Sequence, residues 1–299
     1  MGLPGAVTAL MFDADGFLWI GSYRDGLSRY DGERFVYFTT GDGLAHDHVQ
    51  AMCQDLSGLL WFATEGGVSC HDGTSFISYT TADGLPDDDV RAVLQDKVGS
   101  IWLGTRSGLV RHDGSRFDCF GLSEGLVDLQ VNALVEDRDG DLWIGTQRGL
   151  SRWDGRVLHG YGRGDGLSVD GIDALAMDAD GRLWIGGREG VNCRYQGRFG
   201  APHGMQGQLA GVRAITCCDD GQVWFGTEHG LRQTQRPHSH PDWAHISTRD
   251  GLVNNQIRSI VQDSAANFWV GTSGGISQYS RTFTSLTTAH GLVHDDVRA

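Results

Sequence analysis

Residues 131–161, VNALVEDRDGDLWIGTQRGLSRWDGRVLHGY, decide the fold. They hold four short runs rich in apolar and β-branched residues, separated by turns that contain glycine, which is typical of strands joined by hairpins. The second run, Leu142-Trp143-Ile144-Gly145, is apolar throughout and indicates a strand buried on both faces. A two-layer sandwich would leave one face of most strands wet, so this stretch favours a small sheet packed between two others.

The same pattern recurs along the chain. The central tryptophan of the second run returns after steps of 42, 41, 41, 41, 40 and 45 residues, at Trp19, Trp61, Trp102, Trp143, Trp184, Trp224 and Trp269. Twelve residues before each tryptophan stands a β-branched residue: Val7, Val49, Val90, Val131, Ile172, Val212 and Ile257. Two glycine turns in every unit argue against a helical repeat of this length. Seven four-stranded units predict an all-β fold, a seven-bladed β-propeller of four-stranded antiparallel blades.

Two small-residue positions recur in every unit. The first follows the tryptophan and its aliphatic neighbour and is occupied by Gly21, Ala63, Gly104, Gly145, Gly186, Gly226 and Gly271. Because alanine replaces glycine once, what recurs is small size, as a close approach of neighbouring sheets requires. The second opens the third strand and is always glycine, at Gly26, Gly67, Gly108, Gly149, Gly190, Gly230 and Gly275. An invariant glycine at this point predicts a turn with positive φ.

The repeat also sets the expected domain organisation. We expect residues 1–299 to form a single β-propeller with blades at 7–48, 49–89, 90–130, 131–171, 172–211, 212–256 and 257–296. Residues 297–299 begin an eighth repeat that does not continue, so the chain is expected to be a piece of something longer. Because residues 7–12 already supply the first strand of blade one, we expect blade seven to pack against blade one through side chains only, with residues 290–299 outside its sheet.

The composition excludes several classes of protein. Forty-five glycines and five prolines among 299 residues fit a turn-rich β protein and exclude collagen and proline-rich disorder. The formal net charge of -14 repels phosphate backbones and anionic bilayers, so nucleic acid is not an expected partner. Neither a secretion signal nor an apolar stretch of about 18 residues is present, so no membrane insertion is expected. The six cysteines lack paired spacing and are expected to be buried thiols.

Several motifs resemble the two-component regulator propeller repeat. They are Leu18-Trp19-Ile20-Gly21, Gly26-Leu27-Ser28-Arg29-Tyr30-Asp31-Gly32, Phe38-Thr39-Thr40 and Asp42-Gly43-Leu44, and the resemblance covers nearly the whole chain. It implies a ligand-sensing propeller in the periplasmic sensor region of a hybrid histidine kinase, often one of two rings before a small β domain and a membrane span. This sequence departs from that pattern because it shows no second ring, β domain, span or kinase motif. Compartment and signalling output therefore do not follow from these residues.

One face of the predicted ring carries the candidate site. Alternating strand direction places the second-to-third turns and the connections between blades on this face, which we call the turn face, and ligands of propellers usually bind near its axis. The candidate ligand-binding residues are its turn residues Arg24, Glu65, Arg106, Arg148, Arg188, Glu228 and His229. Four arginines in an acidic protein favour bidentate recognition of carboxylate or phosphate groups. The alternative is that exposed hairpin turns are simply polar.

Three further groups of residues have a functional and a structural interpretation. His46 and His48, with Glu228 and His229, form the one plausible metal constellation, although loop histidines are more often solvated. An aspartate that ends the first strand should accept backbone N–H groups of its own turn rather than bind calcium, at Asp13, Asp55, Asp96, Asp137, Asp178 and Asp263. The residue after each β-branched start varies, and it either tunes a ligand or keeps a channel polar: Thr8, Gln50, Arg91, Asn132, Asp173, Arg213 and Arg258.

Together these features predict a non-catalytic ligand-sensing or protein-interaction propeller. We expect a small polar or anionic ligand, or a protein partner, on the turn face, and neither a cofactor nor a metal. The alternative is a metal-assisted lyase, because Trp61-Phe62-Ala63-Thr64-Glu65 and Trp224-Phe225-Gly226-Thr227-Glu228-His229 resemble segments of streptogramin lyases. That chemistry requires histidine and glutamate to converge near the axis. A third hypothesis is that the chain is a purely structural scaffold or a propeller fragment.

Overall fold

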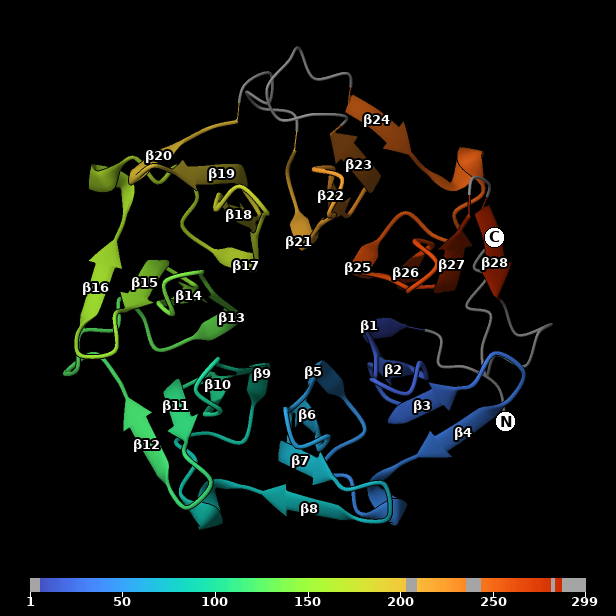
Figure 1. Ribbon diagram of the computed structural model, residues 1–299, viewed down its shortest axis with the longest axis horizontal. Coiled ribbons are helices and arrows are strands. Elements are labelled where there is room, and N and C mark those ends of the chain that lie inside the picture. Colours follow the sequence, from blue (N-terminus) through green and yellow to red (C-terminus); the bar gives the residue numbers. More distant parts are fainter. Residues whose placement is uncertain (1–5, 203–208, 235–242, 281–282, 287–299) are drawn as a thin grey trace.

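Seven small sheets form a closed ring around a central channel (Figure 1). The computed structural model describes residues 6–202, 209–234, 243–280 and 283–286. Each sheet consists of four strands that are consecutive in the chain and pair antiparallel with their neighbours. The prediction of a seven-bladed β-propeller with four-stranded antiparallel blades is confirmed.

The strands occupy equivalent places in every blade. The innermost strands are β1 Val7–Phe12, β5 Val49–Gln54, β9 Val90–Gln95, β13 Val131–Glu136, β17 Ile172–Met177, β21 Val212–Cys217 and β25 Ile257–Gln262. The second strands are β2 Leu18–Ser22, β6 Leu60–Thr64, β10 Ile101–Thr105, β14 Leu142–Thr146, β18 Leu183–Gly187, β22 Val223–Thr227 and β26 Phe268–Thr272. The third strands are β3 Leu27–Tyr30, β7 Gly67–His71, β11 Gly108–His112, β15 Gly149–Trp153, β19 Gly190–Tyr195, β23 Gly230–Thr234 and β27 Gly275–Tyr279.

The outermost strands lead to the next blade. They are β4 Phe35–Phe38, β8 Phe76–Tyr79, β12 Phe117–Phe120, β16 Leu158–Tyr161, β20 Arg198–Gly200, β24 Trp243–Ile246 and β28 Phe283–Leu286. Short 3-10 helices follow four of them, η1 Thr40–Asp42, η2 Thr81–Asp83, η3 Arg163–Asp165 and η4 Thr248–Asp250. Each 3-10 helix ends at a glycine with positive φ, such as Gly43 at 105°. The leucine after that glycine is buried beneath the connection, as Leu44 shows.

The hydrophobic core lies between the blades. Every second strand is buried along its whole length, which confirms the prediction made from its continuous apolar run. Trp143 of β14 packs with Ile172 of β17 and Leu183 and Ile185 of β18 in the neighbouring blade, and Trp143 is fully buried. Each tryptophan thus fills the wedge between its own sheet and an adjacent one.

The glycine after the tryptophan and the β-branched start of the following blade meet in a single contact. A Cβ atom built on Gly145 would lie 2.5 Å from Cγ2 of Ile172, and one built on Gly271 would lie 2.7 Å from Cγ1 of Val7. The predicted close approach of neighbouring sheets is therefore confirmed. The second recurrent glycine also behaves as predicted, since all seven have positive φ, from 72° at Gly26 to 149° at Gly190.

A repeated carboxylate fixes both the first hairpin and the tryptophan. In blade four, Oδ1 of Asp137 accepts the backbone N–H groups of Asp139 and Asp141, as predicted for a turn aspartate. Its Oδ2 accepts the indole N–H of Trp143 at 2.8 Å, a bond that the sequence analysis did not anticipate. The same indole–carboxylate bond occurs in six blades at 2.7–3.0 Å, with Asp13, Asp55, Asp96, Asp137, Asp178 and Asp263 as acceptors.

Blade six lacks this bond. Cys218 stands where the other blades have aspartate, although its hairpin keeps the same backbone hydrogen bonds, from Cys218 N to Gln222 O at 2.9 Å and from Gly221 N to Cys218 O at 3.0 Å. Trp224 is 1% exposed, and its buried indole nitrogen has no hydrogen-bond partner in the part of the chain that the structure describes. A buried donor without an acceptor destabilises the folded state.

The ring closes between blade seven and blade one. Trp269 and Ile276 pack against Val7, Leu10 and Ile20 in one apolar cluster. The backbone N–H of Leu10 also donates to the side-chain oxygen of Ser259 at 3.0 Å. Each described contact between blades seven and one thus involves a side chain of at least one of the two blades. Residues 290–299, on which the closure prediction depends, lie outside the described residues, as do residues 297–299 of the eighth repeat, so that prediction stays open.

The cysteines are free thiols with differing environments. Cys70 and Cys218 are buried, whereas Cys53, Cys193 and Cys217 are half-buried. Burial raises the pKa of Cys53, Cys217 and Cys218 to about 12. The prediction of burial is wrong for Cys119, which is exposed. Cys119 lies on the outermost strand β12, and its thiol donates to Gly84 O of the preceding connection at 3.6 Å.

We predict that Cys218→Asp stabilises the protein. The new carboxylate would accept the indole N–H of Trp224 and the N–H groups of its hairpin, so the free energy of unfolding should rise by about 1 kcal/mol, the usual net value of such a bond. Equilibrium urea unfolding at pH 7 measures the change. Asp137→Ala provides the reciprocal variant, because it orphans Trp143 and should lower stability by about 1–3 kcal/mol. A Cys218→Asp protein less stable than the wild type would contradict the role assigned to the carboxylate.

We also predict that Gly145→Ala destabilises the contact between blades four and five. The added methyl group would overlap the fully buried Ile172, and overpacking of this kind costs about 1–3 kcal/mol. Gly164→Ala is the control, because a Cβ there meets no atom within 4 Å and should change stability by less than about 0.5 kcal/mol. Thermal unfolding of both variants distinguishes the two cases. Equal melting temperatures would show that the sheets can separate to admit a methyl group.

Candidate functional site

Hydrogen bonds fix the turn face as the sequence analysis described it. The backbone N–H of Tyr23, in the β2–β3 turn, donates to Ala6 O just before β1 at 3.0 Å. The N–H of Arg106 donates to Asp89 O in the same way at 3.0 Å, and Ser273 N does so to Gln256 O at 3.0 Å. The second-to-third turns therefore lie beside the connections between blades, on the face where each innermost strand begins.

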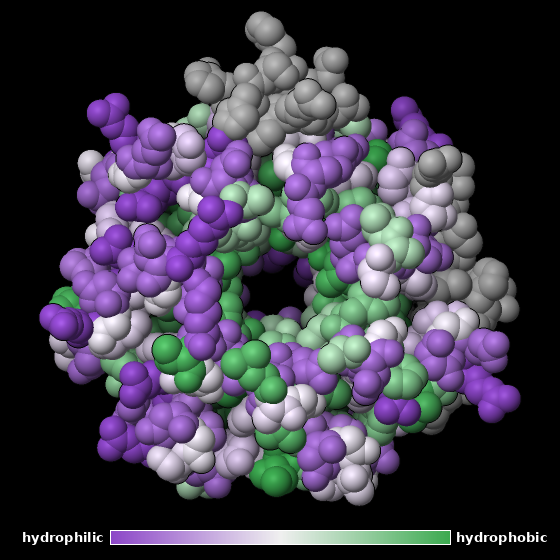
Figure 2. Space-filling view, in the orientation of Figure 1, coloured by the Kyte–Doolittle hydropathy of each residue, from purple (hydrophilic) through white to green (hydrophobic). Residues whose placement is uncertain are grey.

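A cavity of about 390 Å³ opens on the axis at this face. Figure 2 shows the channel passing through the centre of the ring. The cavity is lined by Ala6, Val7, Thr8, Tyr23, His48, Gln50, Arg91, Asn132, Asp173, Arg213 and Arg258. All seven residues at the variable position after the β-branched start belong to this lining, so the irregular position of the repeat forms the wall of the axial cavity. A second hollow of about 290 Å³, lined by the innermost strands of all seven blades, shares these residues.

Three of the neutral wall residues link adjacent blades. The side chain of Asn132 donates to Ile172 O at 3.0 Å, and Gln50 donates to Val90 O at 3.2 Å. Thr8 donates to Val49 O in the same manner. Each acceptor is the carbonyl of the first residue of the next innermost strand. These three side chains therefore have a structural role in addition to making the channel polar.

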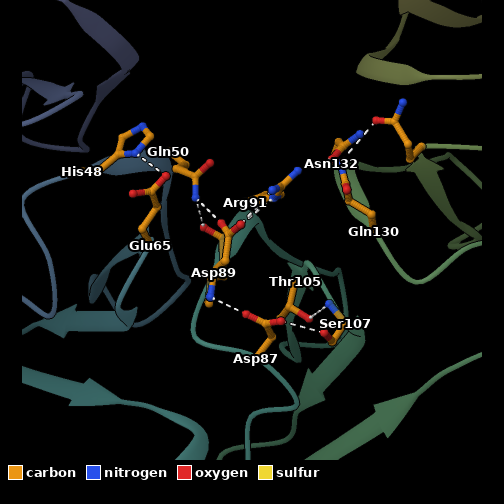
Figure 3. Close-up of polar contacts among 12 residues, drawn as sticks. His48, Gln50, Glu65, Asp87, Asp89, Arg91, Thr105, Ser107, Gln130 and Asn132 are labelled. Atoms are coloured by element: carbon orange, nitrogen blue, oxygen red, sulfur yellow. Dashed lines mark hydrogen bonds and ion pairs between the residues drawn. The ribbon is translucent and has the colours of Figure 1, made fainter.

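One side of the axial cavity is a closed polar network (Figure 3). Arg91 binds Asp89 through Nε at 3.1 Å and Nη2 at 2.7 Å, and its Nη1 donates to Oδ1 of Asn132 at 3.2 Å. Gln50 donates to the other carboxylate oxygen of Asp89 at 2.7 Å. Burial opposes ionisation of Asp89, but the bonds from Arg91 and Gln50 and the charge of Arg106 outweigh it and lower the pKa of this carboxyl group. In this network, each of the three guanidinium nitrogens of Arg91 has a partner.

The opposite side is less completely paired. Arg213 lies 3.0 Å from Glu228 through Nη2 and 3.8 Å from Oδ2 of Asp173 through Nη1. Among the described residues, neither Nε of Arg213 nor Oδ2 of Asp173 has a hydrogen-bond partner, although both atoms are buried. Burial raises the pKa of Asp173, and the charges of Arg213 and Arg188 only partly oppose that rise. This half of the cavity therefore retains unused hydrogen-bonding capacity.

An aromatic side chain stands at the mouth. The ring of Tyr23 meets that of His48 edge to face, with centroids 4.6 Å apart, and Tyr23 is 47% exposed. His48 is nearly buried, and its Nδ1 lies 2.9 Å from Oε1 of Glu65 (Figure 3). An exposed aromatic face beside a polar cavity can pack against a ligand while its other edge is held in place.

The seven predicted site residues form a rim around the axial cavity and do not line it. All seven are exposed: Arg24, Glu65, Arg106, Arg148, Arg188, Glu228 and His229. Three of them directly contact lining residues: Arg24 lies over the ring of Tyr23 at 5.1 Å, Glu65 pairs with His48, and Glu228 pairs with Arg213. Arg148 points away and is 82% exposed, with Nε 4.0 Å from Asp128. Binding of a ligand by these seven residues stays a prediction.

The sequence pattern contained the signal for the cavity wall. The variable position was noted, but its residues could not be ranked above the turn residues without knowing how their charges pair. Pairing across blades, such as the bond from Gln50 to Val90 O, joins residues 40 positions apart in the chain. The variation itself, inside an otherwise regular unit, was the observation that pointed to the wall.

The metal constellation considered from the sequence is not assembled. His48 is engaged by Glu65, while Nδ1 of His46 accepts the backbone N–H of His48 at 3.0 Å. The remaining pair, Glu228 and His229, belongs to the turn between β22 and β23, and Glu228 binds Arg213. Within the described residues, no three side chains of histidine, cysteine, aspartate or glutamate are placed to hold a metal ion together.

Family comparison identifies the repeat. The two-component regulator propeller model matches residues 2–24, 84–107, 125–148, 166–189 and 251–274. Each match runs from the end of one unit across the first hairpin of the next, where the tryptophan and its aspartate lie. Five of the seven units therefore carry the two-component regulator propeller repeat. No curated protein matches the sequence.

Solved structures share the fold at low identity. The extracellular domain of the hybrid two-component system BT4673 from B. thetaiotaomicron has a TM-score of 0.74 and 21% identity over 93% of this chain, which spans 39% of that domain. A streptogramin B lyase has a TM-score of 0.76 and 14% identity, over 96% of each chain. Virginiamycin B lyase from Staphylococcus aureus, solved with quinupristin as a catalytically inactive form, has a TM-score of 0.73 and 13% identity, over 92% of this chain and 94% of the lyase.

These likenesses establish the propeller fold. At identities of 13–21% they carry no information on what this chain binds. In the part of the chain that the structure describes, no helix has the length and apolar character needed to cross a bilayer.

We predict that Arg91→Gln lowers the free energy of unfolding by about 1–3 kcal/mol at pH 7, since it removes charge-assisted bonds from the largely buried Asp89. The folded-state pKa of Asp89 lies below its unfolded value, so this stabilisation is present above about pH 4 and is lost as the pH falls through the folded pKa. Urea unfolding at pH 7 and pH 3 should show the difference shrinking in acid. Arg156→Gln, at an exposed hairpin, controls for loss of a positive charge. A difference independent of pH would contradict the assignment.

Proposed function

We propose that this chain is the non-catalytic, ligand-sensing propeller of a two-component signalling receptor, and that it binds a small polar or anionic ligand in the axial cavity. The observation that carries the proposal is the cavity wall. Seven equivalent positions of a regular repeat carry a different mixture of polar and charged residues there, and these positions enclose about 390 Å³ open to the turn face. A volume of this size suits a small molecule.

The family supports the signalling context. Two-component regulator propeller repeats fill much of the chain, and one structure with the same fold is the extracellular domain of a hybrid two-component system. We therefore place this propeller outside the cytoplasm, in the sensor region of a receptor whose other parts carry the output. The rim residues, including Arg106 and Arg188, would attract an anion toward the cavity even where they do not touch it.

The lyase alternative has weaker support. It rests on the fold shared with the streptogramin and virginiamycin lyases and on local likeness of the segments that end at Glu65 and Glu228. Here Glu65 is paired with His48, and Glu228 is paired with Arg213, on separate blades. Both glutamates thus contact side chains of the cavity wall on different blades. This arrangement fits a binding site better than a reaction centre in which the two glutamates would act together.

A ligand screen tests the proposal. We expect thermal-shift and calorimetric screening of neutral and acidic sugars and other small metabolites to find a compound that raises the melting temperature, because a ligand at 100 times its Kd stabilises the folded state by about 2.7 kcal/mol. The Asn132→Leu variant, which replaces a wall amide with an apolar group, should lose this shift. Arg156→Gln, at a distant hairpin, should retain it.

Two results would contradict the proposal. One is a ligand whose stabilisation is unchanged in Asn132→Leu but abolished by Arg106→Ala combined with Arg188→Ala, which would move binding from the cavity to the rim. The other is binding of a protein partner to the turn face with no small-molecule response, which would make this an interaction propeller. Circular dichroism of each variant confirms that the blades remain folded.

A further inference from the structure

Two arginines of the axial cavity stand side by side. Arg213 of β21 and Arg258 of β25 occupy the same repeat position in adjacent blades, and both line the cavity. Each lies close enough to influence the other, since burial and then the charge of Arg213 lower the pKa of Arg258. Arg258 is exposed and Arg213 is half-buried; like charges held close together at such a site repel, and a bound anion relieves this repulsion.

Arg213 is paired with a carboxylate more closely than Arg258 is. Glu228 binds Arg213 at 3.0 Å and also acts on Arg258 at longer range. The hydrogen bond recorded for the Arg258 side chain is long, from Nε to Ser273 Oγ at 3.4 Å. Within the described residues, no carboxylate lies within 4.0 Å of Arg258, whereas Arg91 in the same wall holds Asp89 at 2.7 Å. Arg258 is thus a cavity cation whose guanidinium has unused donors.

The surroundings of the pair define where an anion can bind. On one side, Asp173 lies 3.8 Å from Arg213 and would repel an anion placed next to it. On the other side, toward blade one, the wall offers the exposed ring of Tyr23, while the hydroxyl of Thr8 already donates to Val49 O. The favourable position is therefore between Arg213 and Arg258 on the Arg258 side, where the buried Nε of Arg213 is a further donor with no partner among the described residues.

We propose that Arg213 and Arg258 form a clamp for the anionic group of a small ligand, a carboxylate, sulfate or phosphate, in the axial cavity. This inference rests on the proposed function and names the chemical class of its ligand. Planar guanidinium groups donate in pairs to such oxyanions, and two of them can hold one group from adjacent blades. Glu228, half exposed on the rim, neutralises one of the two charges, and the ligand supplies the second negative charge.

Asp173 adds a second requirement. Its Oδ2 atom is buried beside Arg213, and no described residue donates a hydrogen bond to it. A carboxylate oxygen in this state needs a donor, and a hydroxyl or amine on the ligand next to its anionic group would provide one. The clamp therefore favours an anion that also carries a hydrogen-bond donor over a bare inorganic ion.

Titration calorimetry with matched probes tests the clamp. The probes are glucuronate and glucose, which differ by a carboxylate, together with inorganic phosphate and sulfate. We expect glucuronate to bind the wild-type chain more tightly than glucose, and phosphate and sulfate to compete with it. Arg258→Gln should weaken glucuronate binding at least tenfold, because it removes charge-assisted bonds to the anion. Arg156→Gln, which removes an equal charge at an exposed distant hairpin, should bind within about twofold of wild type.

The outcomes separate the clamp from the proposed function. If glucuronate binds wild type and Arg258→Gln equally, or if glucose binds as tightly as glucuronate, the clamp is wrong while ligand sensing in the cavity stands. If no anion binds, but the broader screen finds a neutral ligand lost in Asn132→Leu, the clamp again fails alone. If neither the probes nor the screen gives a response, both proposals fail. Unchanged circular dichroism of Arg258→Gln ensures that lost binding reflects the side chain and not unfolding.

Discussion

The bond between an indole N–H and a turn carboxylate is the interaction on which the ring depends. In blade four, Asp137 holds its own hairpin through two backbone N–H groups and orients Trp143 through a third bond. The oriented indole then fills the space beside the next blade, where Gly145 lets Ile172 approach. A local turn thereby determines the packing of a neighbouring sheet. Six blades repeat this bond, and blade six, which lacks it, keeps an equally close contact between Gly226 and Ile257.

The architecture could be predicted from the sequence because each blade is specified locally. The Trp143 run, the glycine turns and the Asp-Gly hairpins act within about forty residues, and their recurrence sets the blade number. Contacts between units were harder to predict. That Gly145 meets Ile172 required knowing that blades pack with a fixed offset, although both residues had been noted as recurrent. Six blades have an aspartate that accepts the indole N–H, and blade six has Cys218 there instead. That the indole of Trp224 lacks this acceptor could be recognised only once the role of the aspartate was known.

The candidate site could be predicted only in part. The turn face followed from strand alternation, and its exposed arginines were conspicuous in the sequence. Arg91 and its partner Asp89 stand two residues apart in the chain, and Gln256 holds the place of Asp89 before Arg258, so this difference was present in the sequence. The sequence could not show that both arginines line one axial cavity. Arg148 differs from Arg106 and Arg188 because it is the second residue of its turn, and its side chain is 82% exposed.

A ring of repeats imposes its own limit on such a site. Equivalent residues after each β-branched start converge on the axis, so seven identical charges there would repel one another strongly at short range. The repeat avoids this by varying the one position, which here carries three neutral residues, Asn132 among them, and four charged ones. Where two arginines remain adjacent, at Arg213 and Arg258, the repulsion is left partly uncompensated by the chain. An anionic ligand bound at this pair therefore relieves more charge repulsion than it would elsewhere on the cavity wall.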